Sequence, residues 1–268
     1  MGGLLEVSTA DFVTTIRLNR PPVNALTPAL QEELVEWLDR LKDDDGTRVV
    51  VLTSAIERYF MAGADIQAMA GEGGLDRDDP AGAEKIAQMS RRSQAAFAAL
   101  ERWPKPVIAA INGHALGGGC ELALCCDYRF MVDDGRSTIG LTEVSLGLIP
   151  GAGGTQRLTR LVGPARATEL IFEGIRLKAA QAEAIGLVHE SLPPDRFSET
   201  VATRSAQLAR RAPLALRFAK EAILAAHERP GKGFEVEAEN FGRVAMTEDA
   251  MSGIMAFLSK QEADFKGR

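Results

Sequence analysis

Two carboxylates, each beside a glycine-rich turn, are the residues of this chain best suited to chemistry. Glu121 ends the stretch Asn-Gly-His-Ala-Leu-Gly-Gly-Gly-Cys-Glu at 112–121, and Glu143 begins the stretch 143–156, which contains Gly-Ala-Gly-Gly. Glycine allows positive φ and has no Cβ, so a ligand can closely approach the backbone N–H groups of such turns. Amide donors of this kind stabilise a developing oxyanion, and two nearby carboxylates can transfer protons. The pattern predicts acid–base chemistry beside a polarised carbonyl group.

Both glycine turns are predicted to precede helices. An apolar helix is expected at 122–126, and the glycines at 151–154 come before a second helix at 155–161. A helix N-terminus directs free N–H groups and a positive dipole end at whatever lies there. Glu121 alone could be a first-turn carboxylate that only stabilises the dipole. Three consecutive glycines cost backbone entropy, so their presence before Glu121 favours close approach of a ligand.

A third segment with small residues lies at 60–66. Ala62, Gly63 and Ala64 would let a ligand lie against the backbone, and Asp65 can cap the turn that follows. Taken alone, this is a common loop composition. The segment therefore gains meaning only together with the two glutamate turns.

Other catalytic and cofactor motifs do not fit this chain. The Gly-Ala-Gly-Gly turn fails the dinucleotide fingerprint, because position 156 is Gln and no ribose-binding acid follows at the expected distance. A Walker A motif and a Gly-x-Ser-x-Gly nucleophile elbow are absent. The histidines, at 114, 189 and 227, have no partners at metal-ligand spacing, although His114 could line a pocket. The sequence therefore indicates neither a metal nor a redox cofactor.

Composition places the chain among ordinary globular proteins, with 268 residues of which 46% are hydrophobic and 25% charged. The net charge of −6 argues against a broad nucleic-acid surface, although a local basic patch could still bind an anionic small molecule. No apolar run approaches the roughly 18 to 20 residues needed to span a bilayer, and we expect no signal peptide. Cys120, Cys125 and Cys126 fit neither a disulfide framework nor a zinc site, so we expect buried thiols and a cytoplasmic location.

Strand and helix patterns alternate through the first part of the chain. Strands are expected at 12–18, 49–52, 106–111 and 128–132. Thr27 followed by Pro28 is typical of a helix start, and leucines recur at helical spacing through Lys42. A further helix is expected at about 83–100. Strands that alternate with helices are typical of an α/β protein.

Beyond residue 164 helical patterns dominate, with one more extended stretch at 187–191. Helices are expected at 165–174, 178–185, 196–211, 214–227 and 234–265, the last with a break near Thr247. The chain therefore divides into an α/β core at 1–195 and a helical C-terminal region at 196–268. The glycine-rich, acidic stretch 71–82 is interpreted as a surface loop, either a solvated connector or a flap over a substrate pocket.

Three motifs in order resemble the enoyl-CoA hydratase/isomerase (crotonase) family. They are Ala-Gly-Ala-Asp-Ile at 62–66, the stretch at 112–121, and Gly-Leu-Ile-Pro-Gly-Ala-Gly-Gly-Thr-Gln-Arg at 147–157. The likeness covers nearly the whole chain, from Asn-Arg-Pro-Pro-Val-Asn-Ala-Leu at 19–26 to Ala-Phe-Leu-Ser-Lys at 256–260. The resemblance implies an α/β spiral of ββα units, followed by C-terminal helices that build trimers, often paired into hexamers.

The resemblance also implies roles for individual residues. An acyl-CoA thioester would have its carbonyl polarised by the backbone N–H groups of Ala64 and Gly118. Glu121 would activate a water, while Glu143 would pass a proton to or from Cα of the substrate. No separate cofactor is implied, because CoA is part of the substrate. Further contacts with the acyl-CoA are expected from Ala62, Asp65, Ile66, Gly151, Phe241 and Lys260, the last on a phosphate.

The expected reaction is hydration of 2-trans-enoyl-CoA to 3-hydroxyacyl-CoA, in fatty-acid or related acyl-CoA breakdown. Both glutamates are present, and Δ3-Δ2-enoyl-CoA isomerases typically lack the first. An isomerase, decarboxylase or thioesterase with the same oxyanion hole is the alternative, as is an inactive protein of the same fold that binds a partner such as RNA. The expected partners are acyl-CoA and further copies of this chain, with no nucleic acid and no membrane.

Overall fold

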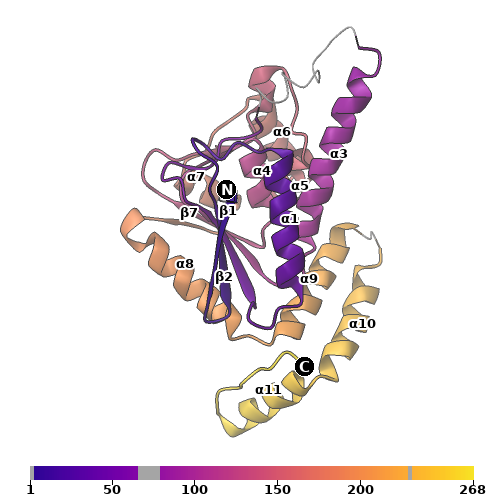
Figure 1. Cartoon of the computed structure of the whole chain (residues 1–268). Coiled ribbons are helices and arrows are strands. Elements are labelled where there is room, and N and C mark those ends of the chain that lie inside the picture. The colour runs from indigo at the N-terminus through magenta and orange to yellow at the C-terminus, as the bar shows by residue number, and fades with distance from the viewer. Residues whose placement is uncertain (1–2, 66–78, 229–230) are drawn as a thin grey trace.

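A six-stranded sheet forms the base of the fold, which is described by a computed structural model for residues 3–65, 79–228 and 231–268 (Figure 1). The strand order is β1-β2-β3-β5-β7-β9. The first two strands pair antiparallel, and all other pairs are parallel. The strands are β1 (Leu5–Ala10), β2 (Val13–Leu18), β3 (Val49–Ser54), β5 (Val107–Ile111), β7 (Tyr128–Val132) and β9 (Glu190–Leu192).

A smaller sheet contains β4 (Tyr59–Met61), β6 (His114–Leu116) and β8 (Ile139–Gly140), paired in parallel in that order. Each of these strands comes next along the chain after a strand of the large sheet. The strands β3, β5 and β7 are neighbours in the large sheet, and β4, β6 and β8 are neighbours in the small sheet. Every turn of the chain therefore adds one strand to each sheet. This winding is the spiral that the resemblance to the crotonase family implies.

Helices pack on both faces of the large sheet, because side chains alternate along each strand. On one face, Val50 and Leu52 join a cluster with leucines of α1 (Pro28–Lys42) and with α3 (Gly82–Glu101). On the other, Val49 and Val51 join a cluster with α8 (Pro194–Ala209). The α1 helix begins as expected, with the Thr27 side chain accepting a hydrogen bond from the backbone N–H of Leu30.

Short helices follow the second and third turns of the spiral: α4 (Gly118–Leu124), η1 (Glu143–Leu146), α5 (Gly154–Val162), α6 (Pro164–Phe172) and α7 (Ala179–Ala184). The first of these comes directly after β6, and η1 comes shortly after β8. Both therefore begin at the carboxyl edge of the small sheet. This placement brings the two glutamates of interest to that edge.

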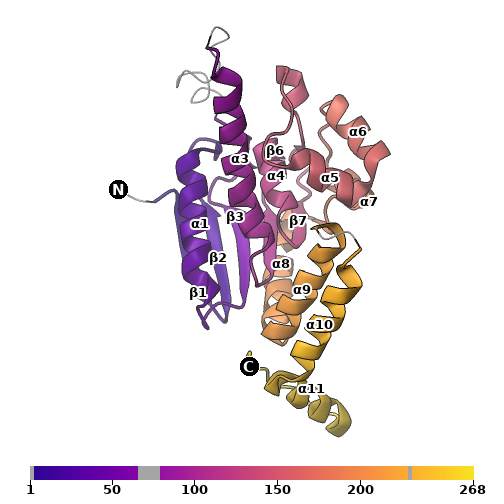
Figure 2. The same ribbon diagram turned by 90° about the vertical axis from the view of Figure 1, so that its right-hand side faces the viewer.

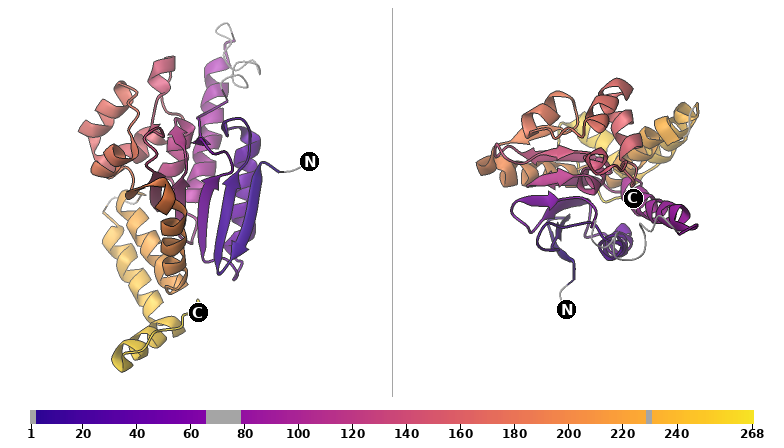
Figure 3. Two further views of the ribbon diagram at one scale, coloured as in Figure 1. Left: turned by 90° about the vertical axis from the view of Figure 1, so that its left-hand side faces the viewer. Right: turned by 90° about the horizontal axis from the view of Figure 1, so that it is seen from above.

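The C-terminal helices are α9 (Pro213–Glu228), α10 (Gly233–Ala245) and α11 (Glu248–Ser259). Figure 2 shows α9 and α10 side by side, and α11 lies at the opposite end of the molecule from the start of α3 (Figures 1 and 3). We call α10 and α11 the C-terminal arm. The arm exposes many apolar side chains: Phe234, Phe241, Met246, Met251, Ile254, Met255, Phe257 and Leu258.

The chain end folds back from the arm toward the core. Asp249 is buried and accepts hydrogen bonds from the backbone N–H groups of Lys266 (2.6 Å) and Gly267 (2.8 Å). Arg48, directly before β3, donates to the carbonyl of Phe265 at 3.0 Å. None of the helices in the described part of the chain combines the length and apolar character needed to cross a bilayer.

Two expected strands differ from those observed. Phe12 lies outside the strand predicted at 12–18, because Asp11 and Phe12 both adopt positive φ in the tight turn between β1 and β2. The strand predicted at 187–191 is instead Glu190–Leu192, and Leu187 and Val188 are buried ahead of it. The boundary between 1–195 and 196–268 stays a prediction. The loop interpreted at 71–82 lies for the most part outside the described residues.

Candidate active site

The candidate site lies at the carboxyl ends of the three strands of the small sheet. Gly63 and Ala64 follow β4, Gly117 and Gly118 follow β6, and Glu143 follows β8. Because the three strands are parallel neighbours, their carboxyl ends share one edge. Ligand sites in parallel sheets commonly form at that edge. Three motifs that are far apart in the sequence are thus brought together.

The backbones at Ala64 and Gly118 approach closely. A Cβ added to Gly118 would lie 3.7 Å from the Ala64 nitrogen. The Leu26 N–H donates to the Gly63 carbonyl at 2.7 Å, and the Leu26 carbonyl accepts from the Asp65 N–H at 3.0 Å. In such a parallel bridge the N–H of Ala64 points away from Leu26. Gly118 is the first residue of α4, where N–H groups have no intrahelical acceptor. The two amides can therefore serve one oxygen atom.

Glu121 is held firmly from one side. It lies in the first turn of α4 and is only 3% exposed. Its Oε1 atom accepts hydrogen bonds from the backbone N–H groups of Ala152 (2.7 Å) and Gly154 (2.8 Å). Burial raises the pKa of Glu121, while the two amide donors and the Arg157 guanidinium act to lower it. The second glycine turn, at 152–154, thus holds the Glu121 carboxylate through two backbone hydrogen bonds.

Glu143 has the opposite surroundings. It is the first residue of η1, and a Cβ on Gly117 would lie 3.1 Å from its Oε1 atom. Its Oε2 atom is buried and accepts no hydrogen bond from any described residue. Burial, with a smaller contribution from the charge of Glu121, raises the pKa of Glu143 to about 7. A carboxyl group with such a pKa can exchange a proton near neutral pH.

The two carboxylates therefore differ in kind. Desolvation raises the pKa of both groups, but the two amide donors and Arg157 oppose this at Glu121, whereas the pKa of Glu143 reaches about 7. Because each charge acts on the other group, the pair titrates as a unit. Such a pair can supply one base and one acid at the same pH.

Of the other expected contacts, those near β4 and α5 lie around this edge. Asp65 forms an ion pair with Arg20 at 2.7 Å, a partner that the sequence did not reveal. The Gly151 carbonyl accepts from the Ser90 hydroxyl at 2.5 Å and the Gln94 side chain at 3.1 Å. The Ala62 N–H donates to a backbone carbonyl. Ile66, also expected in the site, lies outside the described residues.

The two expected contacts from the tail lie elsewhere in the chain. Phe241 on α10 is 73% exposed, and Lys260 ends α11 with positive φ. Figures 1 and 2 show α11 well apart from α4, which carries Glu121. Within one chain, the structure does not bring Lys260 to the glutamates.

The cysteines and histidines have structural surroundings. Cys120, Cys125 and Cys126 are free and buried, as expected. The Nδ1 atom of His114, the first residue of β6, lies 3.0 Å from the Thr138 hydroxyl.

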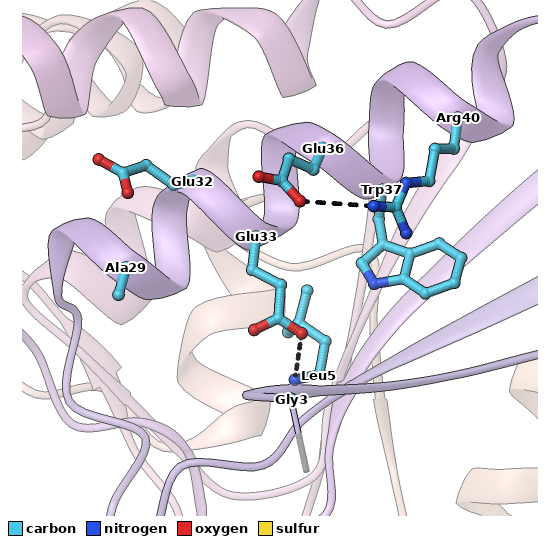
Figure 4. Close-up of a pocket in the computed structure, with 8 residues that line it drawn as sticks. All are labelled: Gly3, Leu5, Ala29, Glu32, Glu33, Glu36, Trp37 and Arg40. Atoms are coloured by element: carbon cyan, nitrogen blue, oxygen red, sulfur yellow. Dashed lines mark hydrogen bonds and ion pairs between the residues drawn. The ribbon is translucent and has the colours of Figure 1, made fainter. Parts of the chain in front are cut away.

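A pocket outside this site lies beside α1 and the start of β1 (Figure 4). It is lined by Gly3, Leu5, Ala29, Glu32, Glu33, Glu36, Trp37 and Arg40. The Glu33 carboxylate accepts hydrogen bonds from the N–H groups of Leu4 and Leu5, and thereby secures the first strand. None of the expected site residues lines this pocket.

Comparison with known proteins agrees with the geometry. Residues 8–268 match the family described as Enoyl-CoA hydratase/isomerase. The 2,3-dehydroadipyl-CoA hydratase of Escherichia coli is 40% identical over 266 residues, which covers 98% of this chain and 99% of the relative. The crotonyl-CoA hydratase of Syntrophomonas wolfei is 34% identical and covers 94% of each protein.

A solved structure shows the same fold. The crystal structure of an enoyl-CoA hydratase from Bacillus anthracis superposes with a TM-score of 0.89 at 39% identity. It covers 99% of this chain and 100% of the other. The chain therefore belongs to the enoyl-CoA hydratase/isomerase family, with the α/β crotonase fold and its C-terminal helices.

Proposed function

We propose that this protein hydrates 2-trans-enoyl-CoA thioesters to 3-hydroxyacyl-CoA. The observation that carries the proposal is the pairing of Glu121 and Glu143 beside the backbone amides of Ala64 and Gly118. Addition of water at Cβ of the enoyl group places negative charge on the thioester oxygen. Two amide donors stabilise that enolate, and loss of one such donor typically costs about 10²- to 10³-fold in rate.

The two carboxylates divide the proton transfers. Glu121 takes a proton from the water, whose oxygen bonds to Cβ, and Glu143 gives a proton to Cα. This division needs an ionised Glu121 and a protonated Glu143. The amide donors to Glu121 and the raised pKa of Glu143, about 7, support that assignment. After each turnover Glu121 holds the proton and Glu143 is ionised, and proton exchange restores the starting state.

The names of the relatives support hydration over other reactions of the family. Both the Escherichia coli and the Syntrophomonas wolfei proteins are named as hydratases of enoyl-CoA thioesters. Their names differ in the acyl group, so they do not fix the chain length for this protein. Presence of both glutamates is the feature that sets this proposal above isomerisation.

The proposal extends to the C-terminal arm and to the cell compartment. Lys260 meets a phosphate at the site of a neighbouring copy, because α11 lies apart from α4 within one chain, and the exposed Phe241 packs on CoA at the same site. The helical region at 196–268 builds a trimer or a dimer of trimers, and the core at 1–195 holds the acyl-CoA. The three free thiols support a cytoplasmic location.

Turnover of crotonyl-CoA tests the proposal directly. Purified protein should remove the absorbance of the conjugated enone without added metal or nicotinamide. Product analysis with crotonyl-CoA and a 3-enoyl-CoA separates hydration from isomerisation, and a series of longer and branched enoyl-CoA thioesters defines the acyl preference. Absence of hydration across the whole series would refute the proposal.

A further inference from the structure

The turn that grips Glu121 is itself held by a buried ion pair. Arg157 of α5 donates from Nε and Nη2 to Oε2 of Glu101, at 3.0 and 2.8 Å. Its Nη1 atom donates to the carbonyl of Ala152 at 2.8 Å. The side chains of Arg157 and Glu101 are 9% and 17% exposed. One guanidinium thus connects α3, through Glu101, to the residue whose N–H binds Glu121.

The local backbone is shaped to admit this guanidinium. Gly153 adopts a φ of +104°, and a Cβ there would lie 2.3 Å from Nη1 of Arg157. Glycine at 153 therefore both allows the turn and leaves room for the arginine. The helix α3 also contacts Gly151, directly before the 152–154 turn, because Ser90 and Gln94 donate to the Gly151 carbonyl. Two neighbouring carbonyls at the start of the turn, those of Gly151 and Ala152, are thus held by side chains of α3 and by Arg157.

We infer that Arg157, anchored by Glu101, is a positioning residue that fixes the 152–154 turn and thereby aims the Glu121 carboxylate at the reacting water. The inference rests on the proposed function, since it assigns Arg157 a part in the same proton transfer. Arg157 touches no reacting atom in this scheme. It acts only through the Ala152 carbonyl and through its charge.

The charge of Arg157 adds a second effect. Its positive charge lowers the pKa of Glu121 against the burial that raises it. The titratable and charged groups around Glu121 are Glu143 beyond β8, Arg157 of α5, Cys120 on α4 and Cys125 at the end of that helix, while Glu101 of α3 pairs with Arg157. Burial raises the pKa of both thiols, so they stay neutral at working pH. Among the described residues, Arg157 is the cation that favours an ionised Glu121.

Two variants separate geometry from charge. Arg157→Lys keeps a positive charge, but a single ammonium cannot reproduce the fork that reaches both Glu101 and Ala152. We expect kcat to fall about 10²-fold with KM little changed, because a displaced catalytic group loses rate and not thioester binding. The acidic limb of the pH profile should stay in place.

The second variant removes the whole ion pair. Arg157→Met with Glu101→Gln leaves no unpaired buried charge, which protects folding. Here kcat should fall similarly, and the acidic limb should move to higher pH because Glu121 loses its cation. Arg160→Met is the matched control, since Arg160 is exposed on the same helix. It should have wild-type kcat and pH profile.

A readout independent of activity completes the test. Infrared titration of the ligand-free protein, with the Glu121 band identified by its loss in Glu121→Gln, should give a higher apparent pKa in the double variant. Wild-type kcat and an unshifted Glu121 band in the double variant would overturn the inference. So would a kcat loss matched by the loss of folded protein in circular dichroism. If the wild type hydrates no enoyl-CoA, the proposed function fails, while the infrared shift still decides whether Arg157 acts on Glu121.

Discussion

Gly154 and Glu121 are in direct contact at the heart of the site. The Gly154 N–H donates to Oε1 of Glu121 at 2.8 Å, and a Cβ at position 154 would lie 2.9 Å from Cγ of the same glutamate. That Cβ would also lie 2.9 Å from Cδ2 of Leu141. No side chain fits between the turn and the carboxylate, so the glycine sets how deeply Glu121 is seated.

Substitution of this glycine should therefore impair catalysis more than folding. Gly154→Ala is expected to displace the Glu121 carboxylate and to lower kcat by about 10²-fold, with KM little changed. Steady-state kinetics with crotonyl-CoA measures both. Gly233→Ala is the control, because its new Cβ would meet only ordinary contacts at 3.6 Å or more. Equal kcat for Gly154→Ala and wild type would show that Glu121 tolerates displacement.

Substitution of either glutamate proposed to transfer a proton should lower the rate directly. Glu121→Gln and Glu143→Gln keep the size of the side chain but cannot exchange a proton. Each should lower kcat by at least about 10²-fold, in the range of general acid–base contributions. KM should change little, because thioester binding depends on the amides and on CoA contacts. A Glu121→Gln variant that hydrated crotonyl-CoA at the wild-type rate would leave Glu121 as a helix-capping carboxylate.

The effects of Glu121→Gln and Glu143→Gln on kcat should not be additive. In the proposed reaction both groups act on one water and one enolate, so the double variant is expected to lose little more than the more severe single variant. Measurement of kcat for all four proteins gives the coupling. Loss of rate equal to the product of the two single effects would indicate that the carboxylates act in separate steps.

The raised pKa of Glu143 predicts how stability depends on pH. Its pKa rises from 4.5 to about 7 on folding, so the folded chain binds the proton more tightly than the unfolded chain. We compare the free energies of unfolding of the wild type and Glu143→Gln. Their difference should be constant below pH 4.5. As pH rises from 4.5 to about 7, the wild type should lose up to about 3 kcal/mol relative to the variant.

Urea unfolding of the two proteins between pH 4 and 8 checks this difference. Because Glu121 and Glu143 titrate as a pair, the difference reports the pair and not one isolated group. Glu173 is an exposed residue within 1–195, so Glu173→Gln shows how loss of a surface carboxylate alone changes the free energy of unfolding. A difference between wild type and Glu143→Gln that stays constant with pH would contradict the prediction.

Lys260 provides the test of CoA binding by the arm. Lys260→Ala should raise KM for enoyl-CoA and weaken its dependence on salt, because an exposed charge pair with a phosphate is screened by ions. Lys232→Ala, also on the arm and exposed, is the matched control. An unchanged KM and salt dependence for Lys260→Ala would mark Lys260 as a solvated surface residue.

The exposed apolar face of the arm predicts self-association. Phe257 and Leu258 are 82% and 69% exposed and belong to a group of exposed apolar side chains on the arm. Contiguous apolar surface of this kind commonly marks a protein–protein interface. Light scattering at micromolar concentration should give the mass of three or six chains. Phe257→Ser with Leu258→Ser should lower that mass, whereas Phe12→Ser, at an exposed turn of the core, should not. A monomer mass for the wild type would contradict the prediction.

Much of the fold could be predicted from the sequence, because its signals are local. Thr27 and Pro28 mark the start of α1, and Pro164, Pro194 and Pro213 each stand at the first position of a helix. The strands of the small sheet escaped prediction. They contain only two or three residues each, too few to show a period. Their existence depends on pairing with turns of the spiral that lie elsewhere in the chain.

The site also contains features that the sequence reveals and contacts that it does not. Glu121, Glu143 and the glycines around them stand out in the sequence because their types and spacing are unusual. The contacts of Asp65 with Arg20 and of Arg157 with Glu101 do not, since 45 and 56 residues separate the partners. Only the folded spiral brings them together. Sequence thus revealed the groups suited to proton transfer, but not the contacts that hold them.

The order of strands in the small sheet also sets the order in which a growing chain can complete the site. The first amide comes with β4, and the second arrives with Glu121 after β6. Glu143 follows β8, and the turn that grips Glu121 is made last, at 152–154. A nascent chain that ends before this turn holds both amides and both glutamates. It still lacks the backbone N–H groups of Ala152 and Gly154, which hold the Glu121 carboxylate in the complete fold.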